Sequence, residues 1–194
     1  MSGRVLPWLF NFAWLAWVLY WLMAGRGRLK PVARRESGLE RLGHTLPLAI
    51  AVGLFWLPEV KGTSGLLFMR FVPPAAILAW LGLGITVAGL GFSIYARRYL
   101  GGNWSGTVTL KEGHSLVREG PYRVIRHPIY TGIIVAFAGT ALAQGQWRGL
   151  LSLLLVGGSL IVKLGREERW MGAQFGDEYQ QYQKHSWALV PRIF

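Results

Sequence analysis

The sequence predicts an all-α fold, an integral membrane helical bundle with about five transmembrane helices. Hydrophobic residues make up 52% of the 194 residues and gather in charge-free runs that are too long for the core of an ordinary soluble domain. Basic residues collect between these runs, and the formal net charge is +12. The chain contains no cysteine, which excludes disulfides, thiol catalysis and cysteine-ligated metals.

Five charge-free runs are the candidate spans, and they cover residues 5–24, 42–58, 71–96, 128–147 and 149–162. The first, third and fourth are close to or above the roughly 20 residues that a helix needs to cross the bilayer core. The second and fifth are shorter, so we expect these helices to be tilted, shielded or extended at their ends.

The first run follows a basic residue, Arg4, as the apolar core of a signal peptide would. Its length and the basic residues that come after it indicate instead a retained first span. Several large aromatic side chains crowd this run, which is typical of anchoring to lipid and to the membrane interface: Trp8, Trp14, Trp17, Tyr20 and Trp21.

The distribution of Lys and Arg predicts how the bundle is oriented. Six lie between the first and second runs, six between the third and fourth, and five after the fifth, which leaves four for the opposite side. Because positively charged loops stay cytoplasmic, we expect the amino terminus outside and the two long loops and the carboxy-terminal segment inside. Nucleic-acid binding is the alternative for so basic a chain, but these charges flank apolar spans and form no continuous face with interleaved aromatics.

Four glycines in the third run, Gly82, Gly84, Gly89 and Gly91, invite comparison with a nucleotide-binding loop. Such a loop needs a strand before its tight turn, and a charge-free run with no strand ahead of it does not provide one. We interpret these glycines as small residues that permit close helix packing, and we interpret the pair 157–158 in the fifth run in the same way.

The polar loop over residues 97–127 is where we expect a ligand. Turn-like units end at Gly113 and at Gly120–Pro121, so the backbone over 114–117 is predicted to be extended. Free N–H and C=O groups of an extended segment pair either with the protein or with a ligand, and an adenine ring suits so compact a loop.

Pro128 fits the first position of the fourth helix, where its missing N–H costs nothing, and this places His127 at the helix cap. The first helical turn carries unpaired N–H groups and partial positive charge, which would stabilise the carboxylate of a ligand. His127 either hydrogen-bonds that carboxylate or caps the helix, and its position leaves both interpretations open. A single His without neighbouring Cys does not indicate a metal site.

Glu167 and Glu168 stand just after the fifth run, in a chain that has only nine acidic residues. One interpretation is a solvated amphipathic helix in which Glu and Arg neutralise one another. The other is a site for a cationic ligand, because low-dielectric surroundings strengthen the field of two adjacent carboxylates.

Short motifs follow one another in a fixed order between Gly101 and Pro191. They are Gly-Gly-Asn-Trp-Ser (101–105), Gly-His-Ser-Leu-Val (113–117), Gly-Pro-Tyr (120–122), Arg-His-Pro-Ile-Tyr (126–130), Glu-Glu (167–168) and Phe-Gly-Asp-Glu-Tyr (175–179). In these motifs the chain resembles the isoprenylcysteine carboxyl methyltransferase family of integral membrane enzymes, including its shorter prokaryotic members, and more distantly the phospholipid N-methyltransferases. The first hundred residues add only hydropathy and span count.

The resemblance implies S-adenosylmethionine as the methyl donor, S-adenosylhomocysteine as its product, and no metal. The cofactor pocket would face the cytoplasm, between the loop before the fourth span and the carboxy-terminal helix. Residues 114–117 and Tyr122 would line the adenosine, residues 127–130 would meet the methionine part, and Glu167 would bind its ammonium group. The full set implied for the cofactor is His114, Ser115, Leu116, Val117, Tyr122, Arg126, His127, Pro128, Ile129, Tyr130, Glu167 and Glu168.

The resemblance also implies a lipophilic or lipidated acceptor, contacted by Asn103, Trp104 and Lys163, and favours carboxyl O-methylation of the isoprenylcysteine type. In the family an Arg stands four residues before the cofactor-binding Glu, where this chain has Lys163. A Lys keeps the charge but lacks the planar fork that grips a carboxylate. Phospholipid-amine N-methylation and thiol S-methylation are therefore alternatives, and an amine acceptor predicts a nearby base and a rate that rises with pH.

These predictions divide the chain into residues 1–100, with three spans and the basic cytoplasmic loop 25–41, and residues 101–194, with the catalytic region. We expect the protein to lie in a prokaryotic inner membrane and to cross it several times. Two other functions compete with the methyltransferase. One is an NADPH-dependent membrane reductase, and the other is a non-catalytic scaffold in which His127 and the two Glu only cap and neutralise.

Overall fold

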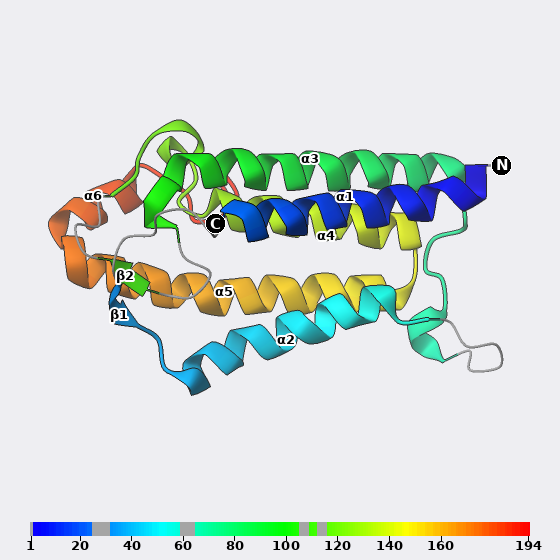
Figure 1. Cartoon of the computed structure of the whole chain (residues 1–194), viewed down its shortest axis with the longest axis horizontal. Coiled ribbons are helices and arrows are strands. Elements are labelled where there is room, and N and C mark those ends of the chain that lie inside the picture. The colour runs from blue at the N-terminus through cyan, green and yellow to red at the C-terminus, as the bar shows by residue number, and fades with distance from the viewer. Residues whose placement is uncertain (1, 25–31, 59–64, 105–108, 112–115) are drawn as a thin grey trace.

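The computed structural model describes residues 2–24, 32–58, 65–104, 109–111 and 116–194. Five long helices run along one axis of the molecule (Figure 1). Helices α1 (Ser2–Ala24), α3 (Ala76–Leu100) and α4 (Pro128–Gln144) lie together, and α2 (Gly38–Trp56) lies beside α5 (Trp147–Phe175). The predicted all-α helical bundle is confirmed, with each charge-free run forming one helix.

Local signals fix where the helices begin and end. The second helix starts earlier than the charge-free run because Ser37 and Glu40 form a capping box, in which Ser37 Oγ accepts from the Glu40 N–H at 3.3 Å. Pro128 occupies the start of α4, as predicted. That helix ends where Gly145 adopts a left-handed conformation (φ 59°) and donates its N–H to Ala141 O at 2.9 Å.

Three of the helices in the described chain are long and apolar enough to cross a membrane: α1 over Val5–Ala24, α3 and α5. The fourth helix is apolar but has only 17 residues. Helix α5 has 29 residues, so it continues from the charge-free run directly through Glu167 and Glu168. The acidic pair therefore stands on a rigid extension of a membrane helix.

Helices α3 and α4 make the closest contact in the bundle. A Cβ added at Gly82 would lie 2.5 Å from Gly139 O, and one added at Gly89 would lie 2.5 Å from Gly132 O. These neighbours are backbone atoms, which cannot rotate away. The predicted role of Gly82 and Gly89 in close helix packing is confirmed.

The same interpretation is wrong for four other glycines. Among the described residues, nothing lies within 4 Å of a Cβ built at Gly84, Gly91, Gly157 or Gly158. Gly84 and Gly91 stand two residues after the packed glycines, which is about half a helical turn and points them away from α4. In α5 the glycine that approaches a neighbour is Gly149, whose added Cβ would lie 3.0 Å from Ala141 Cα.

Polar side chains inside the bundle are paired with one another. Trp14 Nε1 donates to Thr140 Oγ1 at 3.2 Å, and Thr140 Oγ1 lies 3.2 Å from Thr86 Oγ1. Thr140 also donates to Ala136 O at 2.9 Å. These bonds tie α1, α3 and α4 together without leaving the buried hydroxyls unpaired.

Several short elements lie at one end of the bundle. Helix α6 (Asp177–Lys184) follows α5 after Gly176, which has a φ of 51°. The antiparallel strands β1 (Val32–Arg35) and β2 (Thr109–Lys111) pair the two long loops, a feature that the sequence did not predict. The 3-10 helices η2 (Gly101–Asn103) and η3 (Gly120–Arg123) also lie at this end. The 3-10 helix η1 (Leu66–Phe68) lies at the opposite end.

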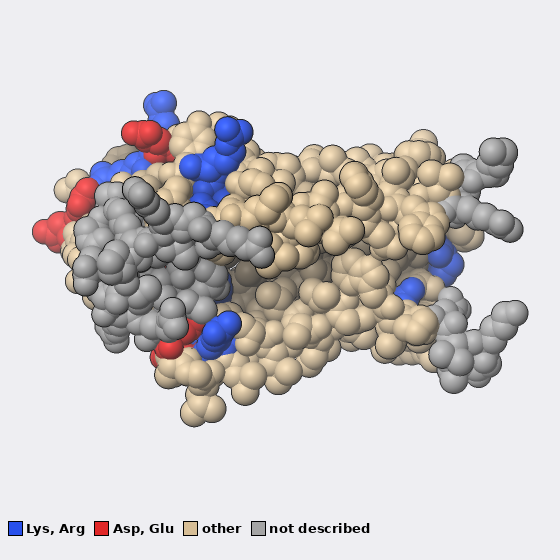
Figure 2. Space-filling model, in the orientation of Figure 1, with Lys and Arg blue, Asp and Glu red and all other residues tan. Residues whose placement is uncertain are grey.

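Charged side chains on the face shown in Figure 2 gather at the two ends of the molecule, and a broad uncharged band lies between them. The end that carries α6 has both acidic and basic residues, whereas the described residues visible at the opposite end are charged only by Lys and Arg. This distribution is typical of a bundle whose middle is surrounded by lipid.

Candidate functional site

A cavity of about 450 Å³ opens where the apolar middle of the bundle meets the charged end that carries α6. Its walls come from α1, α2, α4, α5 and α6 and from the segment that precedes α4. Small-molecule sites have volumes of roughly 300 to 1,000 Å³, so the cavity is large enough for a ligand.

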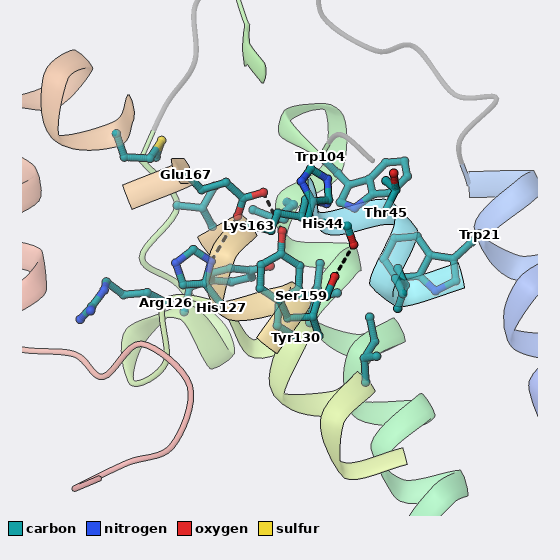
Figure 3. Close-up of a pocket in the computed structure, with 18 of the residues that line it drawn as sticks. Trp21, His44, Thr45, Trp104, Arg126, His127, Tyr130, Ser159, Lys163 and Glu167 are labelled. Atoms are coloured by element: carbon teal, nitrogen blue, oxygen red, sulfur yellow. Dashed lines mark hydrogen bonds and ion pairs between the residues drawn. The ribbon is translucent and has the colours of Figure 1, made fainter. Parts of the chain in front are cut away.

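One wall of the cavity holds a cluster formed by Glu167, His127 and Tyr130 (Figure 3). Tyr130 Oη donates to Glu167 Oε1 at 2.6 Å, and His127 Nδ1 lies 3.4 Å from Glu167 Oε2. The Glu167 side chain is 24% exposed. It is a carboxylate fixed by two partners and still accessible from the cavity, which suits it to receive a cationic group.

Glu168 faces the other way and supports this cluster. Its carboxylate accepts from Arg126 Nε at 2.7 Å and from Gln183 Nε2 at 3.2 Å, and it lies 3.3 Å from His127 Nε2. Glu168 is not among the residues that line the cavity. The adjacent carboxylates therefore differ in role, because Glu167 faces the cavity and Glu168 holds Arg126 and His127 in place.

The segment after α6 pins the polar loop that precedes α4. Arg126 N–H donates to Trp187 O at 2.8 Å and His127 N–H to Ala188 O at 3.0 Å. The Tyr182 hydroxyl donates to Tyr122 O at 2.5 Å. His127 is the N-cap residue of α4, but its side chain makes no capping bond and is held by the two Glu instead.

Burial and charge change the acidity of the groups around the loop. Burial alone would lower the pKa of His127, but hydrogen bonds to Glu167 and Glu168 outweigh it and leave the pKa above its usual value. Burial is also the main cause that raises the pKa of Tyr182 to about 12 and the pKa of Tyr122 further still. Both phenols are therefore neutral donors at physiological pH.

The remaining walls are apolar and aromatic. They include Trp17 and Trp21 of α1, Leu48 of α2, and Trp104, whose ring centroid lies 4.9 Å from that of Trp21. Trp17 Nε1 donates to Ser93 Oγ at 2.7 Å, so one of these rings is fixed. Trp8 is 73% exposed, as expected of a side chain that anchors the protein in lipid, whereas Trp17 and Trp21 line the cavity.

The cavity is bordered by α1 on one side and α2 on the other. These helices meet near one end, where Trp56 Nε1 donates to Asn11 Oδ1 at 3.1 Å. Toward the end that carries α6 the two helices have different partners. Trp17 of α1 donates to Ser93 of α3, whereas His44 O of α2 accepts from Ser159 of α5. Figure 2 shows the surface hollowed between the two pairs of helices.

Most residues predicted for the site lie together at this cavity. Those that line it are Trp104, Leu116, Val117, Tyr122, Arg126, His127, Ile129, Tyr130, Lys163 and Glu167. Pro128 is buried at the start of α4 and does not line the cavity. His114, Ser115 and the side chain of Asn103 lie outside the described residues.

Sequence reasoning missed much of the cavity wall. His44, Thr45, Leu48, Ser159, Met171, Tyr179 and Tyr182 also line it. One signal was available, because His44 is the only His in a charge-free run and ionisable residues inside membrane helices are usually functional. Tyr179 ends the motif over residues 175–179, and the remaining residues follow from how α2, α5 and α6 pack, which no motif records.

Two polar atoms of the cavity wall, Trp21 Nε1 and Tyr122 Oη, are buried without a hydrogen-bond partner among the described residues. Buried polar groups are normally paired. A ligand with hydrogen-bonding groups in this cavity is a suitable partner for both.

The chain matches the model of the phospholipid methyltransferase family over residues 77–178. This range covers α3, α4, α5 and the loop that carries His127. Helices α1 and α2, which supply a further part of the cavity wall, lie outside it.

Two curated relatives match parts of the chain. A methanethiol S-methyltransferase of Bradyrhizobium diazoefficiens is 39% identical over 74 residues, which are 38% of this chain and 27% of that protein. The protein-S-isoprenylcysteine O-methyltransferase of Schizosaccharomyces pombe is 33% identical over 81 residues, 41% of this chain and 34% of that protein. The matches thus span about a third or less of these relatives.

The fold is similar to that of a solved eukaryotic intramembrane Ras methyltransferase, isoprenylcysteine carboxyl methyltransferase. The TM-score is 0.52, and the match covers 83% of this chain and 55% of that one. Sequence identity is 21%, so the likeness concerns the fold.

Proposed function

The chain belongs to the phospholipid methyltransferase family, and on this premise we propose that it is an integral membrane methyltransferase that takes its methyl group from S-adenosylmethionine and gives it to a lipophilic acceptor. The resemblance to the isoprenylcysteine carboxyl methyltransferases that the motifs predicted is confirmed by the family match and the shared fold. One observation carries the proposal: a single cavity joins a half-buried acidic cluster to an aromatic, apolar wall.

The residues at the acidic end fit S-adenosylmethionine. Glu167 offers a fixed carboxylate to the ammonium group, and Arg126 and the first turn of α4 offer positive charge to the carboxylate of the methionine part. Tyr122 offers an unpaired hydroxyl. Leu116 and Val117 line the cavity nearby and offer apolar contacts to a nucleoside.

When bound, S-adenosylmethionine supplies an electrophilic methyl group on a sulfonium sulfur. Transfer of that group is an in-line displacement, so the protein contributes alignment and the exclusion of water. His127, held by Glu167 and Glu168, and Tyr130, held by Glu167, form a rigid wall for the donor. None of these side chains has to form or break a covalent bond for the reaction to proceed.

The acceptor belongs at the aromatic end. Trp17, Trp21 and Leu48 offer contacts to a lipophilic body, and the opening between α1 and α2 allows it to arrive from the bilayer. Lys163 lines the cavity with its Nζ 5.5 Å from the centre of the Tyr130 ring. Its charge suits an anionic acceptor, either the carboxylate that the motifs favour or a thiolate.

We place the site on the cytoplasmic side of the membrane. The loops over residues 25–41 and 97–127 and the end of α5 carry most of the basic residues, and the described parts of these segments lie at the end of the bundle where the cavity opens. This orientation gives the site access to a donor made in the cytoplasm. Residues 101–194 supply the donor half of the cavity, and the first hundred residues supply most of the acceptor half.

Titration of detergent-purified protein with S-adenosylhomocysteine tests this function. Wild-type protein should bind with a dissociation constant in the micromolar range or below. Glu167→Gln should weaken binding by roughly 10- to 100-fold, because the ammonium group loses a charged partner worth about 1.4 to 2.8 kcal/mol. Calorimetry measures both values.

The matched control is Glu178→Gln, since the Glu178 side chain is 56% exposed, pairs with Arg118 and does not line the cavity. It should leave the affinity unchanged. A folded, monodisperse wild-type protein that binds no S-adenosylhomocysteine would contradict the proposal. Binding of NADPH in its place would support the membrane reductase.

A further inference from the structure

A second group of buried ionisable residues borders the cavity, outside the acidic cluster. His44 lies in α2 with a side chain that is 3% exposed, and the Glu36 side chain beside it is fully buried. Glu36 Oε1 lies 3.6 Å from His44 Nε2. Neither residue belongs to the segment that matches the family.

The contacts of His44 define where its proton lies. Arg166 Nη1 is 3.3 Å from His44 Nδ1, and a guanidinium can only donate a hydrogen bond. Nδ1 must therefore carry the lone pair, and the N–H of the neutral ring is at Nε2, facing Glu36. The lone pair of the neutral ring therefore accepts from Arg166, and it becomes available to a proton when Arg166 turns to its other partners.

His44 stands at the acceptor end of the cavity. It lines the cavity together with Thr45 and Leu48 of its own helix and with Lys163, and Figure 3 shows it near Lys163 and Tyr130. A neutral imidazole backed by a buried carboxylate is the arrangement by which enzymes remove a proton from a weakly acidic nucleophile.

We propose that His44 is the base that takes the proton from a thiol acceptor and that Glu36 is the residue that positions its ring. This rests on the proposed methyltransferase function and narrows its substrate class. An ionised carboxylate already carries its attacking electron pair and has no use for such a base. A thiol is largely protonated at neutral pH, because its pKa is about 8.5, and it gains from one.

The proposed step balances in atoms and charge. The S–H bond of the acceptor breaks, and its proton goes to Nδ1 of His44. The acceptor sulfur uses that electron pair to bond the methyl carbon, whose bond to the donor sulfur breaks and leaves both electrons on that sulfur. The products are a neutral thioether, neutral S-adenosylhomocysteine and an imidazolium, which then releases its proton to water.

The charges around His44 suit this cycle. Burial, together with Arg166 and Lys163 of α5, disfavours a resting imidazolium and keeps the ring neutral, whereas Glu36 and Glu167 stabilise the proton once it arrives. Arg166 keeps partners when it leaves Nδ1, because it also donates to Glu40 O and lies 3.6 Å from Glu36 Oε2.

A structural clamp between α2 and α5 is the competing explanation for these residues. The clamp has a side-chain part, because Arg166 contacts His44 Nδ1 and Glu36, and a main-chain part, since Ser159 donates to His44 O and Arg166 donates to Glu40 O. His44→Gln retains the two main-chain bonds. The substitution therefore removes the base and the contacts of its ring, and it leaves the main-chain contacts between α2 and α5 in place.

The test compares two thiols in wild-type protein and in His44→Gln. An alkyl thiol needs the base at neutral pH, whereas an aryl thiol of low pKa is already ionised. We expect kcat/KM for the alkyl thiol to fall roughly 100-fold in His44→Gln, and less than about threefold for the aryl thiol. The alkyl-thiol defect should shrink as the pH approaches about 10, where the free thiol ionises without help.

Glu36→Gln should show the same pattern with a smaller loss, and His185→Gln, at an exposed residue outside the cavity, should show none. Affinity for S-adenosylhomocysteine should stay within about twofold in all three variants, because His44 does not hold the donor. Equal losses for both thiols at every pH would mark His44 as structural and overturn the proposal.

Methylation of a carboxylate, but of neither thiol, by wild-type protein that binds S-adenosylhomocysteine would overturn the proposal and leave the proposed function standing. Absence of that binding in wild-type protein is a different result, which contradicts the proposed function itself.

Discussion

Helix α4 has two unlike sides, and the contrast between them explains how the site is held. Toward α3 it presents Gly132 and Gly139, which bring the two backbones together so closely that a Cβ would overlap main-chain atoms. Toward the cavity it presents Tyr130 and Ile133. One side is packed backbone to backbone, and the other leaves space for a ligand.

The difference shows which part of the bundle provides rigidity. A cavity wall cannot be supported from the cavity, so α4 is fixed from behind by α3 and at its start by the segment after α6. The contacts that Glu167 makes with His127 and Tyr130 then keep their geometry with only small movements of the side chains. Close packing on one side thus permits an open, preorganised site on the other.

The largest effect is expected from filling the α3–α4 contact. Gly89→Leu would drive a side chain into Gly132 O and the backbone of Ala136, so the helices must separate. We expect a loss of about 3 kcal/mol or more and, with it, loss of S-adenosylhomocysteine binding. Thermal unfolding in detergent and ligand titration measure these effects.

Gly91→Leu is the control for that substitution. It changes the same residue type two positions along α3, where nothing among the described residues lies within 4 Å of a Cβ. It should leave stability and binding close to wild type. If both variants were equally stable, the close α3–α4 contact would not be what supports the site.

A smaller effect separates the two adjacent carboxylates. Glu168→Gln leaves Arg126, whose side chain is 11% exposed, without its charged partner. We expect a loss of about 2 kcal/mol, or roughly 4 to 8 °C in Tm. Glu167→Gln should lower the stability less than Glu168→Gln does, and it should weaken binding of S-adenosylhomocysteine more. Melting curves and titrations of both variants would show whether their effects are reversed in this way.

The smallest effect is a dependence on pH. The pKa of His127 is raised, so the folded protein binds this proton more tightly than the unfolded chain does. The resulting stability is fully present below the unfolded pKa of about 6.5 and is lost as the pH rises through the higher folded pKa.

His127→Gln should therefore lower Tm more at about pH 6 than at about pH 9 when no ligand is bound. His185→Gln serves as the control, because His185 is exposed and lies outside the cavity. A Tm difference between wild type and His127→Gln that grows with pH would mean that the two Glu do not favour the proton on His127.

Helix positions were well predicted from sequence because each depends on local patterns. Apolar runs gave the five helices, and Pro128 marked the start of α4. The close packing of Gly82 and Gly89 also followed from composition, but Gly84 and Gly91 have the same composition and face outward. Which side of a helix meets its neighbour depends on the packing of the whole bundle, and single residues do not record it.

The site was predictable where it depends on motifs and unpredictable where it depends on packing. His127, Tyr130 and Glu167 come together as expected, although they lie nearly forty residues apart. The resemblance implied Glu167 for the ammonium group but counted Glu168 among the cofactor residues as well, and the facing of α5 shows that only Glu167 lines the cavity. The acceptor wall from α1 and α2 has no motif, and its His44 was overlooked for that reason.

A structure determined with S-adenosylhomocysteine bound tests the central claim most directly. Our account predicts the ligand in the cavity, with its ammonium nitrogen within about 3.2 Å of a Glu167 oxygen and its sulfur directed toward Lys163 and His44. Ligand density elsewhere, or an ammonium group that contacts Glu168 and not Glu167, would contradict it.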